Sequence, residues 1–237
     1  MTGVQTCALP ILLKKMGYEW AGSNFHLSYG MVELPSGKMK SREGTIVDAD
    51  DIMAEMIQTA KELSEELGKL EEIEEQEKDR LYNLIGLGAL KYFLLKVDPK
   101  KKMLFDPKES IDFAGNTGPF IQYTYTRIKS LLRKAETDQN LTFSDEYDLE
   151  DKERDLIKLL NEYPEVIKDA GEALSPALVA NYVYELAKSF NNLYQALSIL
   201  KDVDPEVTTF RLNLSNETGK VIQSAMLLLG IELPDRM

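Results

Sequence analysis

Apolar residues recur every three or four positions along most of the chain, which is the spacing of amphipathic helices. The clearest run follows Ser175 and Pro176 as an apolar seam, through Val179, Val183, Leu186, Phe190, Leu193, Leu197 and Leu200. Similar spacing predicts a short helix carrying Leu13, Met16 and Trp20. It also predicts longer helices over about residues 48–67, 78–96, 119–134, 153–170 and 212–229. The pattern therefore predicts a mainly α protein.

Residues 24–47 interrupt the helical spacing. Phe25, Leu27 and Tyr29 alternate with other residues as in a β-strand. Glycine and proline then punctuate a loop, at Gly30, Pro35, Gly37 and Gly44. We expect a short strand followed by a loop in this part of the chain.

The composition is typical of a soluble globular protein, because 43% of the 237 residues are hydrophobic and 29% are charged. No segment approaches the roughly 18 uninterrupted apolar residues that a membrane span needs, so we expect no membrane partner. One cysteine, Cys7, and one histidine, His26, exclude an intrachain disulfide and make a zinc centre or a Ser/His/Asp triad hard to build. We therefore predict no metal ligands, and the scarcity of cysteine fits a cytoplasmic protein.

The formal charge of −12 argues at first against a nucleic-acid partner, because phosphates attract lysine and arginine. Two acidic runs account for this charge. Residues 62–79 hold nine acidic and two basic residues, a net of −7, and residues 138–155 hold eight acidic and two basic residues, a net of −6. The rest of the chain sums to +1, so local basic faces can form and an RNA partner is not excluded.

The first eleven residues, MTGVQTCALPI, differ in character from the rest of the chain. They lack the charged and apolar segments of a signal peptide, and they resemble translated sequencing-adaptor sequence. We expect residues 1–11 to be a non-native leader and leave them out of the functional argument. A genuine short N-terminal arm is the alternative.

The segment GKMKSREGT, residues 37–45, places Lys38, Lys40 and Arg42 within five positions between glycines. Such a loop can close over a polyphosphate, because ammonium and guanidinium groups offset the charge that develops on a departing pyrophosphate. Composition alone favours a basic surface loop without a catalytic role.

Three segments resemble the arginyl-tRNA synthetase family of class I aminoacyl-tRNA synthetases. HLSYGMV (residues 26–32) and GKMKSREGT (37–45) look like the end of the family's catalytic domain, and the basic part resembles the KMSKS loop of the class. DFAGNTGPFIQY (112–123), with Arg127, resembles the first helix of the family's anticodon-binding domain. LGIELPDRM (229–237) is similar to the family's C-terminus, so the resemblance covers residues 12–237.

This resemblance implies a helical-bundle anticodon-binding domain preceded by the C-terminal remnant of a class I, Rossmann-like catalytic domain. We expect residues 12–58 to end the catalytic domain with the KMSKS-type loop. Residues 59–111 are then connecting helices, and residues 112–237 are the anticodon-binding domain.

The resemblance also implies an arginine-tRNA ligase, which attaches arginine to its tRNA through arginyl-adenylate during protein biosynthesis and uses ATP with magnesium. Lys38, Lys40 and Arg42 are its implied catalytic residues in the pyrophosphate-forming step. Gly30, Met31 and Val32, with Lys38 and Met39, are implied to bind ATP. For residues 30–32 a strand packed in the core is the alternative.

Two departures from the family's pattern affect these expectations. Ser41 stands where the class usually has lysine, which leaves open which cation meets the phosphates. The HIGH motif and the arginine pocket of the class are absent, so we expect this fragment to be inactive alone.

Tyr123, Arg127, Ser130 and Lys134 fall on one polar face of the helix predicted after Pro119. An aromatic ring and cations on one face suit stacking on unpaired bases and contact with phosphates. Packing of Tyr123 against a neighbouring helix is the alternative. The resemblance adds Asn116 and Met237 to the residues expected to contact arginine tRNA.

The expected partners are arginine tRNA and, in the whole enzyme, ATP and arginine, with a cytoplasmic monomer as the expected state. A function of another class stays open at this point: a non-catalytic helical module that binds tRNA or a protein. The absent HIGH motif is the feature that keeps this alternative open.

Overall fold

The computed structural model describes residues 3–33, 48–66, 74–135, 147–200 and 204–237. Helices dominate these residues, as predicted, and one short pair of strands accompanies them. The elements in chain order are α1 (Gly3–Lys15), the 3-10 helix η1 (Glu19–Ser23), β1 (Val32–Glu33), α2 (Ala49–Glu66), α3 (Glu75–Leu95), β2 (Met103–Leu104), α4 (Pro107–Ser110), α5 (Gly118–Lys134), α6 (Asp151–Ala173), α7 (Pro176–Ala196) and α8 (Pro205–Leu228). No helix among these is long and apolar enough to cross a membrane.

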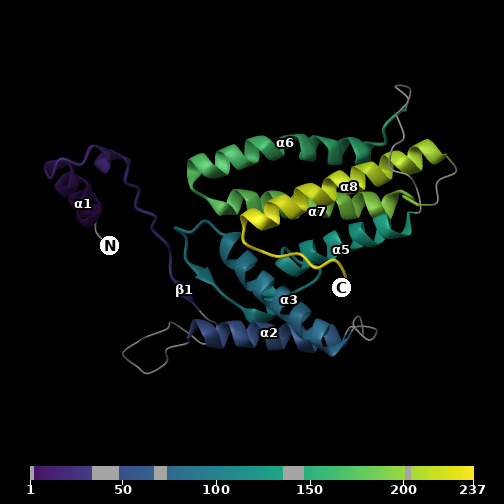
Figure 1. Cartoon of the computed structure of the whole chain (residues 1–237), viewed down its shortest axis with the longest axis horizontal. Helices are drawn as coiled ribbons and strands as arrows, with labels where there is room; N and C mark the ends of the chain where they lie inside the picture. Colours follow the sequence, from purple (N-terminus) through teal and green to yellow (C-terminus); the bar gives the residue numbers. More distant parts are fainter. Residues whose placement is uncertain (1–2, 34–47, 67–73, 136–146, 201–203) are drawn as a thin grey trace.

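The four helices α5 to α8 pack around the larger apolar core. Figure 1 shows α6, α7 and α8 running side by side, with α5 beneath them and the C-terminal tail passing over α5. The first five residues of the predicted seam are buried here, together with apolar side chains of the other three helices: Val179, Val183, Leu186, Phe190, Leu193, Ile121, Ile128, Leu156 and Ile222. The last two seam residues, Leu197 and Leu200, follow the end of α7 at Ala196 and are partly buried. The apolar periodicity therefore identified the core-facing sides of these helices.

Capping residues explain where these helices begin. Thr117 caps α5, since its side chain accepts a hydrogen bond from Phe120 N at 3.3 Å. Ser175 precedes α7 as predicted, but its side chain makes no such bond. The predicted start of the last helix at 212 is wrong: α8 begins at Pro205, because Asp204 accepts from Glu206 N at 2.8 Å and proline suits the first helical position.

A second, smaller core lies between α2, α3 and α4. Buried side chains of α2, of α3 and of the residues that directly follow β2 and α4 form it: Met56, Ala60, Ile85, Ala89, Phe93, Phe105 and Ile111. β1 and β2 pair in parallel, with Val32 opposite Met103 and Glu33 opposite Leu104. α3 contacts both α2 and α5, so it joins the two cores.

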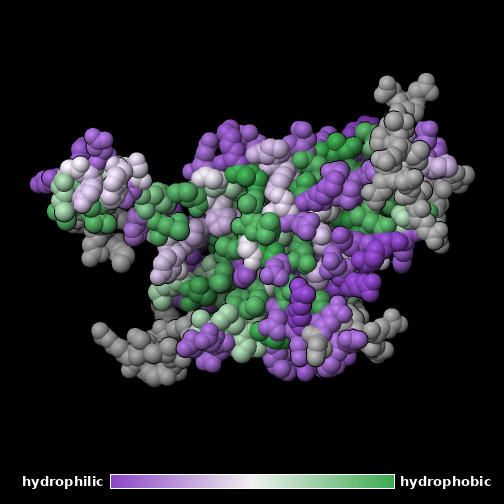
Figure 2. Space-filling model, in the orientation of Figure 1, coloured by the Kyte–Doolittle hydropathy of each residue, from purple (hydrophilic) through white to green (hydrophobic). Residues whose placement is uncertain are grey.

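The N-terminal arm, comprising α1, η1 and residues 24–31, projects from the helical body (Figure 1). The predicted apolar stripe is not buried, because Met16 and Trp20 are more than half exposed. Residues 25–29 form no strand, and Tyr29 is 87% exposed, so that prediction is wrong as well. Figure 2 shows hydrophobic surface on this joining segment, where Phe25 and Leu27 are exposed.

Candidate nucleic-acid interface

A hollow of about 410 Å³ opens between α5, the end of α7 and the C-terminal tail. Residues from all three segments line it: Tyr123, Thr126, Arg127, Ser130, Leu131, Arg133, Lys134, Tyr194, Leu200, Arg236 and Met237. We call this site the α5–tail hollow. It brings together Tyr123, Arg127, Lys134 and Met237, four of the five residues that the sequence predicts to contact tRNA.

Arg127 sits between two aromatic rings in this hollow. Its guanidinium carbon lies 4.9 Å from the ring centroid of Tyr123 and 4.8 Å from that of Tyr194. Both distances are within the range of a cation–π interaction. Tyr123 thus contacts its own helix neighbour Arg127, and the second ring comes from α7.

Asn191, a buried residue of α7, fixes the position of the Arg127 guanidinium by a hydrogen bond. The Nη1 of Arg127 donates a hydrogen bond to Asn191 Oδ1, and Asn191 Nδ2 donates to Thr124 Oγ1 at 2.7 Å. Thr124 Oγ1 in turn donates to Phe120 O at 2.9 Å. Asn191 and Thr124 are buried, so the chain of bonds that orients Arg127 is shielded from solvent.

The C-terminal tail reaches the hollow because polar contacts hold it along α3 and α5. Lys91 Nζ donates to Gly230 O at 2.7 Å, and Gln122 Nε2 donates to Glu232 O at 3.0 Å. Farther along, Arg133 Nη1 donates to Asp235 O at 3.0 Å. These contacts place Arg236 and Met237 at the rim of the hollow.

The α5–tail hollow is cationic although the whole chain carries a net charge of −12. Arg127, Arg133, Lys134 and Arg236 line it, and the described lining includes no acidic side chain. Arginine and lysine contact phosphates, and tyrosine rings stack on unpaired bases. The combination is therefore suited to single-stranded RNA.

Asn116 lies apart from this hollow and has structural partners. Its Oδ1 is 2.6 Å from the hydroxyl of Tyr92, which is also 2.9 Å from Ala180 O. Its carbonyl accepts a hydrogen bond from Lys96 Nζ at 2.8 Å, and burial lowers the pKa of Lys96. The structure therefore does not bring Asn116 together with the other predicted tRNA contacts; it ties α3 to the start of α5 and to α7.

Residues 30–32, the first part of the predicted ATP site, are hydrogen-bonded or paired with β2 and the segment before it. Gly30 N donates to Pro99 O at 2.6 Å, and Met31 O accepts from Met103 N at 3.1 Å. Only glycine fits at position 30, since a Cβ there would lie 2.0 Å from Lys101 O. Val32 begins β1, and Met31 is about half exposed. Lys38, Met39, Lys40 and Arg42 lie outside the described residues.

Sequence reasoning missed Asn191, Tyr194, Arg133 and Arg236. Asn191 follows Phe190 of the seam by one position and Ala187 by four, so its place beside apolar residues of α7 was the available signal, and Tyr194 follows it by three positions on the same helix. Four other polar residues of α7 are exposed: Asn181, Lys188, Asn192 and Gln195. Arg236 reaches the hollow only through the path of the tail.

Comparison with known proteins identifies two families along the chain. Residues 121–237 match the DALR anticodon binding domain, and residues 5–106 match the class I tRNA synthetase (R) catalytic domain. The first match contains the whole α5–tail hollow.

Among curated relatives, arginine–tRNA ligase of Flavobacterium psychrophilum is 60% identical over 227 residues, which is 96% of this chain and 37% of the relative. The arginine–tRNA ligase of Parabacteroides distasonis is 55% identical and is matched over 97% of this chain and 39% of its own length. The chain thus spans under two fifths of these relatives. Thermus thermophilus arginyl-tRNA synthetase has a similar structure, with a TM-score of 0.85 and 28% identity over 96% of this chain and 38% of that one.

Proposed function

The chain belongs to the arginyl-tRNA synthetase family, and from this premise we propose that it binds the anticodon region of arginine tRNA for an arginine-tRNA ligase. The observation that carries the proposal is the cationic, tyrosine-lined α5–tail hollow inside the anticodon-binding domain. We take residues 112–237 as this domain, residues 59–111 as connecting helices and residues 12–58 as the end of the catalytic domain.

In this proposal an unpaired anticodon base stacks in the hollow next to the Tyr123–Arg127–Tyr194 group. Arg127, Arg133, Lys134 and Arg236 contact the neighbouring phosphates, and Met237 gives apolar contact at the rim. Base–aromatic stacking contributes about 1–3 kcal/mol per base, and each phosphate contact adds a salt-dependent term. Asn116 acts on RNA only indirectly, by fixing the start of α5.

The whole enzyme, in the same proposal, activates arginine with ATP and magnesium and transfers it to the tRNA in the cytoplasm. Lys38, Lys40 and Arg42 offset the charge on the departing pyrophosphate, and residues 30–32 with Met39 contact the adenosine. This chain alone should not catalyse ATP–pyrophosphate exchange, because one loop cannot orient two reactants, a contribution worth up to about 7–11 kcal/mol. Exchange above the background of a Lys38→Ala/Arg42→Ala variant would contradict this.

Binding of an arginine-tRNA anticodon stem-loop, measured at several salt concentrations, tests the RNA proposal. Tyr123→Ala should weaken binding about five- to 150-fold and leave the salt slope unchanged, because stacking releases no counterions. Arg127→Ala should weaken binding and flatten the log–log slope by about 0.7–0.9.

Lys168→Ala is the matched control, because Lys168 is an exposed lysine of α6 that pairs with Glu165 and does not line the hollow. It should change neither the affinity nor the slope. If Tyr123→Ala and Arg127→Ala both bind like the wild type while circular dichroism shows intact helices, the hollow is not the RNA site.

A further inference from the structure

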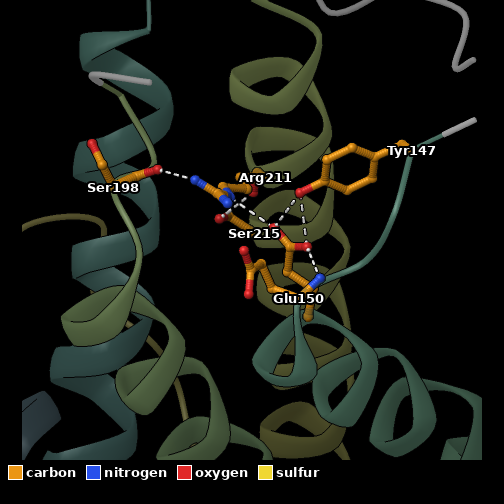
Figure 3. Close-up of polar contacts among 6 residues, drawn as sticks. Tyr147, Glu150, Ser198, Arg211 and Ser215 are labelled. Atoms are coloured by element: carbon orange, nitrogen blue, oxygen red, sulfur yellow. Dashed lines mark hydrogen bonds and ion pairs between the residues drawn. The ribbon is translucent and has the colours of Figure 1, made fainter. Parts of the chain in front are cut away.

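A buried ion pair joins Glu153, in the first turn of α6, to Arg211, in the second turn of α8. Arg211 Nε is 2.7 Å from Glu153 Oε1, and their side chains are 6% and 0% exposed. Neither residue lines the α5–tail hollow. Figure 3 shows Arg211 between Ser198 on one side and Tyr147 on the other.

Hydrogen bonds from three segments converge on this pair. The Glu153 carboxylate accepts from Arg211 Nε, from Glu150 N at 2.9 Å and from the Tyr147 hydroxyl, which is 2.9 and 2.8 Å from its two oxygens. Arg211 Nη1 donates to Ser198 O at 2.8 Å. Ser215 Oγ donates to the carbonyl of Arg211 at 2.6 Å. The start of α6, the segment after α7 and α8 are thus tied at one point.

Stability alone is a weak reason for such a pair. Taking two charges out of water costs several kcal/mol per ion, and replacing a buried pair by neutral groups of similar volume is often neutral or stabilising. What an arginine supplies beyond charge is a planar group with donors in fixed directions, here used towards both Glu153 and Ser198. This favours a role in fixing position.

The segment that Arg211 holds forms a wall of the hollow. Ser198 follows Tyr194 by four residues and precedes Leu200 by two, and both of those side chains line the hollow. Consecutive Cα atoms are only about 3.8 Å apart, so a fixed carbonyl at Ser198 restricts where Leu200 can lie. The neighbouring Ile199 is buried, which extends the restriction into the core.

We propose that Glu153 and Arg211 are positioning residues for the α5–tail hollow: they hold the end of α7 and the segment after it so that Tyr194 and Leu200 face Tyr123 and Arg127. The expected effect on RNA binding rests on the proposed function, whereas the expected position of Tyr194 and Leu200 does not. The pair touches no RNA itself and acts through Ser198.

The test compares two double variants of the whole chain. Glu153→Gln/Arg211→Met removes both charges, and the glutamine side chain keeps an acceptor for Glu150 N. Glu217→Gln/Lys220→Met is the matched control on α8, because this pair has the same 2.7 Å separation but side chains that are 57% and 61% exposed. Both should stay folded, which thermal denaturation checks.

Methyl and ring NMR signals of Leu200 and Tyr194 report the position of the wall directly. They should shift in Glu153→Gln/Arg211→Met and not in the control, and stem-loop affinity should fall at least fivefold with the salt slope unchanged. Unshifted signals overturn the proposal. So do shifted signals with unchanged affinity, when Tyr123→Ala still weakens binding.

Failure of the proposed function looks different: Tyr123→Ala and Arg127→Ala leave RNA binding unchanged, while the NMR signals of Leu200 and Tyr194 still shift. If the double variant does not fold, Arg211→Lys replaces it. Lysine keeps the charge opposite Glu153 but cannot direct separate donors to Glu153 and to Ser198 in arginine's geometry. A folded Arg211→Lys chain with unshifted signals would also overturn the proposal.

Discussion

At the scale of single residues, the α5–tail hollow is organised around Arg127. An arginine on an exposed helix face samples many rotamers, whereas this guanidinium is bounded by two rings and a buried amide. Ordering such a side chain on binding costs about 0.5–1.5 kcal/mol when it is not already ordered. Asn191 therefore lowers the cost of binding without touching the ligand.

Asn191→Leu should weaken stem-loop binding about 2- to 12-fold, because Arg127 must then be ordered by the RNA itself. The salt slope should stay that of the wild type, because no charge is removed. Asn192→Leu is the control, since Asn192 is the next residue along α7 and is exposed. Equal affinity of the Asn191→Leu variant and the wild type would show that Arg127 does not depend on this hydrogen bond.

At the scale of elements, close helix contacts depend on glycines of α3 and α5. A Cβ on Gly86 would lie 2.8 Å from the Cα of Ile57 in α2, and a Cβ on Gly118 would lie 2.6 Å from Gly88 O. Both neighbours are backbone atoms, which cannot move aside as a side chain can. These contacts let α3 pack against α2 on one side and α5 on the other.

Gly86→Ala should lower the free energy of unfolding by about 1–3 kcal/mol, because the added methyl forces α2 and α3 apart. Urea denaturation measures this. Gly171→Ala in α6 is the matched control, as nothing lies within 4 Å of its Cβ position. Alanine should there stabilise the chain by about 0.5–1 kcal/mol through its helix propensity. A Gly86→Ala variant as stable as this control would contradict the close contact.

At the scale of the whole molecule, buried tyrosines link folding to pH. Burial, together with the hydrogen bond to Glu153, raises the pKa of Tyr147 to about 12. Burial also raises the pKa of Tyr92 and of Tyr182. The unfolded chain releases these protons near pH 10, before the folded chain does, so stability falls as the pH rises from 10 towards 12.

The urea midpoint of the wild type should therefore decrease steadily between pH 9.5 and 11.5. Tyr147→Phe should show a smaller decrease over this range, because phenylalanine has no proton to lose. Tyr29→Phe serves as the control, as Tyr29 is 87% exposed and should keep the wild-type decrease. The same pH dependence in all three proteins would mean that Tyr147 does not contribute.

The sequence by itself determined local features of the chain, namely which residues share one face of a helix and where a helix begins. The apolar seam of α7 and the polar face of Tyr123, Arg127 and Lys134 depend only on the 3.6-residue turn of a helix, and Thr117 with Pro119 marks the start of α5 within a few residues. The apolar spacing of the N-terminal arm did not predict burial, because no other element in the described part of the chain covers the arm. The arm around Trp20 and Tyr29 has the spacing of buried elements but stays exposed.

The tertiary structure decided which distant segments meet. Tyr194 and Asn191 join Arg127 because α7 packs against α5, and Met237 joins them because Lys91, Gln122 and Arg133 hold the tail. Asn116, part of the same sequence motif as Tyr123, turns towards Tyr92 instead. Periodicity specifies which face of a helix is buried but not which helix covers it, because that choice depends on how side chains far apart in sequence fit together.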